Sequence, residues 1–220
     1  MNVLIFGATG MVGLGVLREC LLAHDVARVL TVGRTPTGQQ HPKLTELAHA
    51  DLLRYDGIEP ALTGFDACFF CLGVSSAGMS EAEYTRVTYD ITLAAAQVLA
   101  RLNPQMTFVY VSGAGTDSTE QGRSMWARVK GRTENALLKL PFKAAYMFRP
   151  GGIQPLHGIR SKTAAYRIPY MIAAPVLPLL RRLFPAYLTT TEQVGRAMLI
   201  VVRRGFARAV VEARDIDGMR

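Results

Sequence analysis

Three glycines near the start of the chain have the spacing of a phosphate-binding turn: Gly7, Gly10 and Gly13. Glycines let such a turn tighten and let backbone N–H groups approach a phosphate, because a Cβ atom would block both. The amides of a following helix then attract the pyrophosphate of a dinucleotide. The pattern G-x-x-G-x-x-G differs from the usual G-x-G-x-x-G, and a turn that only packs is the alternative. The residues expected to contact a dinucleotide are Gly7, Thr9, Gly10, Met11, Val12 and Gly13.

The residues around this turn favour binding over simple packing. An apolar run over residues 3–6 precedes it and predicts a strand. Apolar residues then recur at Met11, Leu14, Leu17 and Leu21, which is the spacing of a helix. A glycine-rich turn between a strand and a helix is the usual place for a dinucleotide pyrophosphate.

Arg34 stands where dinucleotide-binding chains usually carry an acidic residue that binds the ribose 2′-hydroxyl. A carboxylate would repel a 2′-phosphate, whereas a guanidinium can bind it with two hydrogen bonds. The sequence therefore favours NADP(H) over NAD(H). The alternative for Arg34 is an exposed loop cation, and Arg18 and Lys43 are candidates to assist it.

Two further segments follow expected strands, and ligands bind beyond the carboxyl ends of strands in parallel sheets. Asp51 and Leu52 follow the third strand, where Asp51 is either an acceptor for the adenine amino group or a turn residue. Cys71, Leu72 and Gly73 end the fourth strand, and Gly73 would let the backbone approach a cofactor.

The chain alternates between strand and helix patterns, which predicts an α/β fold with a mostly parallel sheet and helices on both faces. Its 220 residues fit one domain spanning residues 1–220. Expected strands cover residues 2–6, 28–32, 44–49, 66–72, 106–112, 143–149 and 207–212. Expected helices cover residues 10–22, 81–101, 122–139 and 190–203. Ser80 and Glu83 form the pattern of a capping box.

Residues 151–188 break this alternation, because they combine many apolar residues with repeated prolines. Their longest apolar run is too short for a membrane span, which needs about 20 residues. We expect no transmembrane segment and interpret residues 151–190 as a lid or small substrate lobe. A subunit contact and a peripheral membrane anchor are the alternatives.

The cysteine content and the net charge limit the cellular locations and the classes of ligand that the sequence allows. The three cysteines argue against a disulfide framework and favour a reducing, cytoplasmic location. Cys68 and Cys71 lie three apart in an expected strand and so face opposite sides, which favours core packing over a redox or metal pair. The first strand starts at once, so no signal peptide is expected. The net charge of +8 suits an anionic ligand or a solvated basic face, and nucleic-acid and metal-binding motifs are absent from the sequence.

Taken in order, these motifs resemble the atypical, extended-type short-chain dehydrogenases/reductases, and most closely their Tat-interacting-protein-like branch. The matching segments are residues 7–13, 32–34, 70–73, 110–112, 129–131, 148–151 and 189–191. The resemblance implies a Rossmann-type doubly wound sheet that binds NADP(H). It also implies that Pro150, Gly151 and Gly152 lie beside the nicotinamide.

The same resemblance implies a Ser–Tyr–Lys set for hydride-transfer chemistry. Lys130 matches the family lysine, which also contacts the nicotinamide ribose, and Ser112 is the best match for the serine. Gly113 is the alternative occupant of the serine position. Trp126 stands four residues before Lys130, where the family has tyrosine. An indole N–H can donate a hydrogen bond, but it cannot exchange a proton near neutral pH.

This departure leaves three explanations open. Another group supplies the proton, such as Tyr166, Tyr170, His157 or a water held by Lys130. Alternatively, the chain binds NADP(H) without turnover, or its chemistry needs no proton relay. We expect an oxidoreductase or epimerase-like enzyme acting on a carbonyl or hydroxyl of an unknown small molecule. A non-catalytic regulatory or interaction protein is the alternative, and homodimers are common for this fold.

Overall fold

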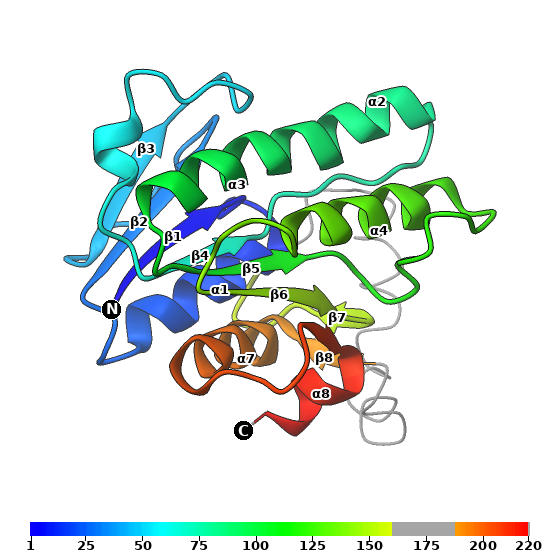
Figure 1. Cartoon of the computed structure of the whole chain (residues 1–220). Helices are drawn as coiled ribbons and strands as arrows, with labels where there is room; N and C mark the ends of the chain where they lie inside the picture. The colour runs from blue at the N-terminus through cyan, green and yellow to red at the C-terminus, as the bar shows by residue number, and fades with distance from the viewer. Residues whose placement is uncertain (160–187, 220) are drawn as a thin grey trace.

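Seven parallel strands form the central sheet of the computed structural model, which describes residues 1–159 and 188–219 (Figure 1). The strands are β1 (Asn2–Phe6), β2 (Arg28–Gly33), β3 (Leu44–Ala48), β4 (Ala67–Phe70), β5 (Thr107–Val111), β6 (Ala144–Arg149) and β9 (Val210–Glu212). Their spatial order is β3-β2-β1-β4-β5-β6-β9. The chain winds outward from β1 to β3, returns to β4 beside β1 and then continues the other way. The order therefore reverses between β1 and β4, where such sheets bind ligands.

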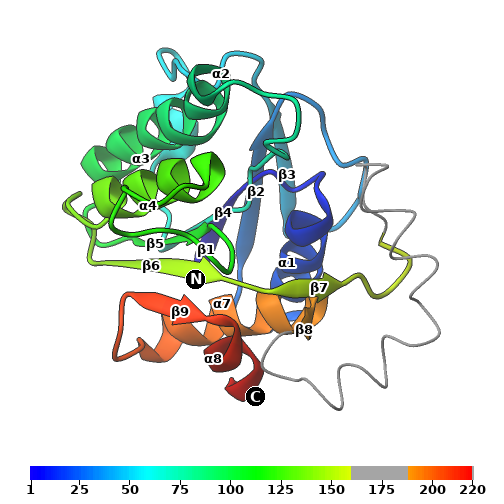
Figure 2. The same ribbon diagram turned by 90° about the vertical axis from the view of Figure 1, so that its right-hand side faces the viewer.

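Helices cover both faces of this sheet (Figure 2). The helices are α1 (Met11–Leu22), α2 (Glu81–Thr85), α3 (Ile91–Leu102), α4 (Met125–Leu137), α7 (Thr191–Arg204) and α8 (Ala213–Gly218), with a π-helical turn η2 (Arg86–Asp90) joining α2 to α3 and a 3₁₀ turn η1 (Glu59–Leu62). Helices α1 and α7 pack on one face, with α8 beside α7, while α3 and α4 cover the other. The predicted α/β, doubly wound architecture is confirmed.

The core consists of two apolar layers, one on each face of the sheet. Val3 and Ile5 of β1 join the layer under α1 and α7, whereas Leu4 and Phe6 join the layer under α3 and α4. Such complete burial on both faces is typical of a parallel sheet. Cys68 belongs to the second layer and Cys71 packs against the first, so the two thiols face opposite sides as predicted.

Most predicted elements agree with the structure to within a few residues, and the capping box of α2 forms between Ser80 and Glu83. The sequence did not predict α8, the η1 turn or the two-stranded sheet of β7 (Gly152–Gln154) and β8 (Leu188–Thr190). Most of the predicted lid, residues 160–187, lies outside the described residues. Among the described helices, each is too short or too polar to cross a membrane.

Candidate functional site

The glycine-rich turn sits at the reversal point of the sheet, directly against the segment that follows β4. Gly7 has a φ of +75°, and a Cβ atom there would lie 2.6 Å from the backbone nitrogen of Leu72. A Cβ atom on Gly13 would lie 2.1 Å from the carbonyl oxygen of Gly7. Both positions therefore require glycine for steric reasons, and a side chain at either would displace the turn.

Backbone amides at the start of α1 are placed to receive an anion. Gly10 is the N-cap, and its N–H donates to the Gly7 carbonyl over 3.0 Å. The first bond of the helix runs from Leu14 N–H to the Gly10 carbonyl, so the amides of Met11, Val12 and Gly13 precede the ladder. The first turn of α1 holds no acidic side chain. Thr9 lies half-buried within the turn, beside these amides.

Arg34 is exposed directly after β2, on a loop that Glu46 of β3 organises. The Glu46 carboxylate accepts hydrogen bonds from the Thr37 amide over 2.7 Å and from the Gly38 amide over 3.1 Å. Burial raises the pKa of the Glu46 carboxyl, but these bonds outweigh that effect and the net pKa falls below its ordinary value. Glu46 thus fixes the path of the loop that presents Arg34, a role that the sequence analysis missed.

The two cations considered as helpers of Arg34 are engaged elsewhere. The Lys43 ammonium donates to the Ala23 carbonyl over 2.7 Å and so caps the carboxyl end of α1, far from the turn where α1 begins. Arg18 pairs with Glu19 of the same helix and lies 4.0 Å from Glu192 of α7. Sequence spacing could not reveal these partners, because they come from the packing of separate elements.

The segments after β3 and β4 border the same edge of the sheet. Asp51 is exposed, and its Oδ1 accepts the Leu53 amide over 3.0 Å, which is the turn role weighed above. Leu52 is buried in the core. The Cys71 amide donates to the Phe6 carbonyl of β1, and a Cβ atom on Gly73 would meet open space. The turn after β1 and the segment after β4 therefore meet through their backbones.

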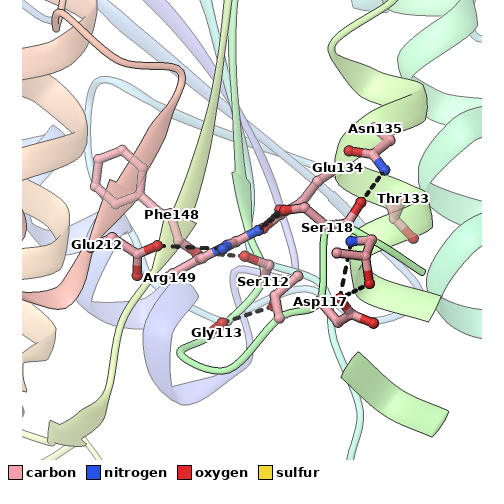
Figure 3. Close-up of polar contacts among 12 residues, drawn as sticks. Ser112, Gly113, Asp117, Ser118, Thr133, Glu134, Asn135, Phe148, Arg149 and Glu212 are labelled. Atoms are coloured by element: carbon pink, nitrogen blue, oxygen red, sulfur yellow. Dashed lines mark hydrogen bonds and ion pairs between the residues drawn. The ribbon is translucent and has the colours of Figure 1, made fainter. Parts of the chain in front are cut away.

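Ser112 follows β5, and its hydroxyl is committed to a neighbouring strand (Figure 3). The Ser112 Oγ donates to the Phe148 carbonyl over 3.0 Å, and the Ser112 amide donates to the same oxygen over 2.8 Å. The next residue, Gly113, has a φ of +140° and no side chain. The hydroxyl of Ser112 thus holds β5 to β6 in this structure.

Lys130 projects from α4 toward the carboxyl end of β5. Its ammonium donates to the Ser112 carbonyl and lies 5.9 Å from the centre of the Tyr110 ring. Burial lowers the pKa of Lys130 to about 8, and the Glu134 carboxylate opposes that change. The lysine is therefore a titratable group poised near neutrality.

Trp126 lies one helical turn before Lys130 on α4, at the same end of the sheet. A Cβ atom on Gly115 would lie 3.5 Å from Trp126 Cη2, so the indole packs along the loop that follows β5. That loop is also tied to the segment after β6, because the Ala114 amide donates to the Pro150 carbonyl over 2.9 Å. Gly151 then leads into β7, which begins at Gly152. Trp126, Lys130 and Pro150 thus converge on the loop after β5.

A buried ion pair between Glu134 and Arg149 lies one helical turn after Lys130, near the loop that follows β5 (Figure 3). Arg149 binds both carboxylate oxygens of Glu134, one of them through its Nε over 3.0 Å. It also contacts Ser118 Oγ at 2.6 Å and Glu212 Oε1 at 3.3 Å. The sequence analysis assigned no role to this pair. An arginine ending an apolar strand and a glutamate one turn after Lys130 are the signals that point to it.

Of the alternative proton donors, only His157 falls within the described residues, and Tyr166 and Tyr170 lie outside them. The His157 Nε2 lies 2.7 Å from Glu192 Oε2 at the start of α7. The imidazole is thus engaged with a helix of the opposite face rather than with Lys130.

Curated proteins of fungi and of the rat are similar to this chain. The fmp52-2 protein of Aspergillus oryzae is 27% identical over 149 residues, which are 67% of this chain and 65% of that protein. The HTATIP2 protein of Rattus norvegicus is 28% identical over 152 residues, which are 68% of this chain and 62% of that protein. The chain therefore spans a little under two thirds of the length of these relatives.

The prediction of a cytoplasmic location is wrong on this comparison. The fmp52 relatives from Aspergillus oryzae, Scheffersomyces stipitis and Emericella nidulans are named as mitochondrial proteins. The prediction failed because free cysteines indicate only a reducing environment. They do not distinguish one reducing compartment from another.

Solved structures share the fold. The Bordetella bronchiseptica enzyme WbmF in complex with NAD⁺ matches with a TM-score of 0.67 at 14% identity, covering 99% of this chain and 76% of that one. The sequence model of the NAD dependent epimerase/dehydratase family matches residues 3–125, which include the glycine-rich turn and the segment after β4. These observations agree with the nucleotide-binding, short-chain-dehydrogenase-like architecture described above, and the chain belongs to the NAD dependent epimerase/dehydratase family.

Proposed function

We propose that this chain is an NADP(H)-dependent oxidoreductase that acts on a carbonyl or hydroxyl group of a small molecule. One observation carries the proposal: the glycine-rich turn and Lys130 occupy the same edge of the sheet, at the ends of β1 and β5. β4 lies between these two strands. In an extended dinucleotide, the pyrophosphate would lie on the glycine-rich turn and the nicotinamide end would lie near Lys130. The separation of β1 and β5 in the sheet fits that arrangement.

The residues present fit the phosphates of a dinucleotide. Gly7 and Gly13 form a cradle that a Cβ atom would fill, and the first turn of α1, whose amides would receive the phosphates, holds no acidic residue. The positive end of the helix dipole adds to this attraction. Arg34 follows β2 on an anchored loop and offers a guanidinium for a 2′-phosphate.

The chain's own residues define what chemistry is available. A bound nicotinamide supplies hydride exchange with the substrate carbon. The Lys130 ammonium, with a pKa of about 8, can hold the nicotinamide ribose and can release or take up a proton near neutral pH. Trp126 supplies an apolar surface along the loop after β5, where its ring lies beside Gly115.

An Arg34→Ala variant is expected to lose its preference for NADPH. A charge-assisted hydrogen bond is worth about 1.5–3 kcal/mol, so the affinity for NADPH should fall roughly 10- to 100-fold while that for NADH changes little. Equilibrium titration followed by cofactor fluorescence measures both affinities. Arg204→Ala is the matched control, because Arg204 is exposed at the end of α7. If the wild type binds NADPH no more tightly than NADH, the proposed role of Arg34 is wrong.

A second candidate function, a non-catalytic NADP(H)-binding regulator, is favoured by two positions. The Ser112 hydroxyl is bonded to the Phe148 carbonyl, and Trp126 replaces the family tyrosine. A site with neither hydroxyl lacks the usual proton relay. Tight NADPH binding with no turnover across a broad panel of aldehydes, ketones and alcohols would favour this candidate.

Trp126→Tyr separates the two candidates. If the remaining site is intact, the phenol lies one turn before Lys130 and restores a proton donor, and general acid–base catalysis is worth roughly 100- to 10,000-fold. We expect NADPH oxidation on the same carbonyl panel to rise by a factor in that range. Trp126→Phe is the control, since it keeps an aromatic ring without a hydroxyl. Equal rates for the two variants would show that the proton comes from another group.

A further inference from the structure

We propose that Glu134, held in place by Arg149, is a positioning residue whose charge favours the ammonium form of Lys130, which the Ser112 carbonyl holds at the cofactor edge of β5. This inference rests on the proposed dinucleotide binding and adds residues that act through Lys130 rather than on the cofactor itself. The buried ion pair would then have a functional role in addition to stabilising the fold.

The geometry places the carboxylate one helical turn from the lysine. Lys130 and Glu134 are four residues apart on α4 and therefore lie on the same side of the helix. The Glu134 side chain is 1% exposed, so its charge acts through protein rather than through water. A negative charge in this position favours the ammonium form of Lys130.

Arg149 fixes the carboxylate from a different element. It comes from the end of β6 and binds both oxygens of Glu134, a geometry that prevents the carboxylate from rotating away. Ser118 of the loop after β5 and Glu212 at the start of α8 hold the guanidinium in turn. The network thus connects α4 to the loop that carries Ser112 and to the neighbouring strand.

The energetic cost of burying the Glu134–Arg149 ion pair indicates that the pair has a role besides stabilising the fold. Burying two charges costs several kcal/mol per ion, and well-packed apolar side chains of similar volume often stabilise a fold equally well. Met147 and Phe148 precede Arg149 in β6 and are completely buried, so apolar side chains suit this part of the strand. An effect on the half-buried Lys130 ammonium, one helical turn away, explains why a charged pair stands here.

Other charged groups packed around α4 have partners of their own. Glu81 of α2 pairs with Arg128, and the Arg132 guanidinium stacks on the Tyr89 ring of η2 at 4.3 Å. From β5, Tyr110 faces Lys130 with its ring, and its hydroxyl interacts with Thr133. Glu134 is thus the carboxylate whose charge acts on Lys130 within the described part of the chain.

The pH dependence of dinucleotide affinity tests this role. A charged Lys130 is present below its pKa of about 8 and is lost above it, so wild-type affinity for NADPH should begin to fall near that pH. Glu134→Gln removes the charge that favours the ammonium, which moves the fall to lower pH by about one unit. Above both midpoints the variant should bind roughly tenfold more weakly than the wild type.

Three comparisons keep the test decisive. Glu81→Gln makes the same substitution in a carboxylate that pairs with Arg128 of α4, and its midpoint should match the wild type. If Glu134→Gln alone does not fold, Glu134→Gln/Arg149→Met removes both buried charges, and the midpoint should move in the same direction by a smaller amount, because the arginine cation that opposes Lys130 is also lost. A purely structural role would weaken binding at every pH without moving the midpoint.

The outcomes separate the two proposals. If the wild type binds neither NADPH nor NADH, the proposed function is wrong, and the positioning role of Glu134 is wrong as well. If the wild type binds NADPH and all variants share its midpoint, the positioning role alone is overturned. A midpoint that moves in the Glu134 variants and not in Glu81→Gln supports it.

Discussion

An Arg149→Met variant is expected to lose about 3–5 kcal/mol of unfolding free energy, because it leaves the Glu134 carboxylate buried without its partner. Glu134 is 1% exposed and Arg149 is 11% exposed, so water cannot replace the lost contacts. Urea denaturation of the wild type and the variant measures the change. The double variant Glu134→Gln/Arg149→Met should recover much of the loss, since no unpaired charge then remains.

An exposed ion pair provides the contrast. Arg101 pairs with Glu59 near the surface, with its side chain 60% exposed. Arg101→Met should therefore change the unfolding free energy by less than about 1 kcal/mol. A loss of similar size for Arg149→Met and Arg101→Met would show that burial does not govern the Glu134 pair.

A Gly13→Ala variant is expected to abolish most dinucleotide binding. The added Cβ atom would lie 2.1 Å from the Gly7 carbonyl oxygen and 2.9 Å from the Cα atom of Ala8, so the turn must move away from α1. Losing two charge-assisted bonds to the pyrophosphate weakens the affinity by roughly 100-fold or more. Overpacking should also lower the unfolding free energy by about 1–3 kcal/mol.

Gly73→Ala is the matched control for stability. A Cβ atom there meets nothing within 4 Å, and the residue lies at the same edge of the sheet. Its unfolding free energy should stay within about 0.5 kcal/mol of the wild type. NADPH titration of both variants completes the comparison, and unchanged affinity in Gly13→Ala would remove the turn from the binding site.

The fold was predictable because its strongest signals are local. The apolar strand before Gly7 and the helical spacing after it specify β1 and α1, and similar patterns specify the other long elements. The short sheet of β7 and β8 was not predictable. Its two strands have three residues each and pair across a long stretch of chain, so neither shows a period that sequence analysis can detect.

The candidate site was predictable in part, and the limit has a physical cause. Glycine spacing reflects a steric demand of one turn, so Gly7 and Gly13 could be assigned from sequence alone. The partners of charged side chains depend on packing between elements. Lys43 caps the end of α1, and Arg149 reaches from β6 to Glu134 of α4, which no spacing within the sequence specifies.

The resemblance to short-chain dehydrogenases implies a tyrosine where this chain has Trp126, and this makes cofactor binding and catalysis separate questions. The turn and Lys130 support binding by geometry that does not involve the missing phenol. In the proposed oxidoreductase, catalysis would depend on the charge of Lys130, because the Ser112 hydroxyl is bonded to β6. Family membership fits either outcome, since it describes the fold and the nucleotide site more closely than the proton relay.

A crystal structure of the chain with NADPH tests the central claim most directly. We expect the pyrophosphate within hydrogen-bonding distance of the amides of Met11, Val12 and Gly13, and the nicotinamide ribose at the Lys130 ammonium. It also predicts the 2′-phosphate beside Arg34. A pyrophosphate bound away from the start of α1, or a nicotinamide that does not reach Lys130, would contradict it.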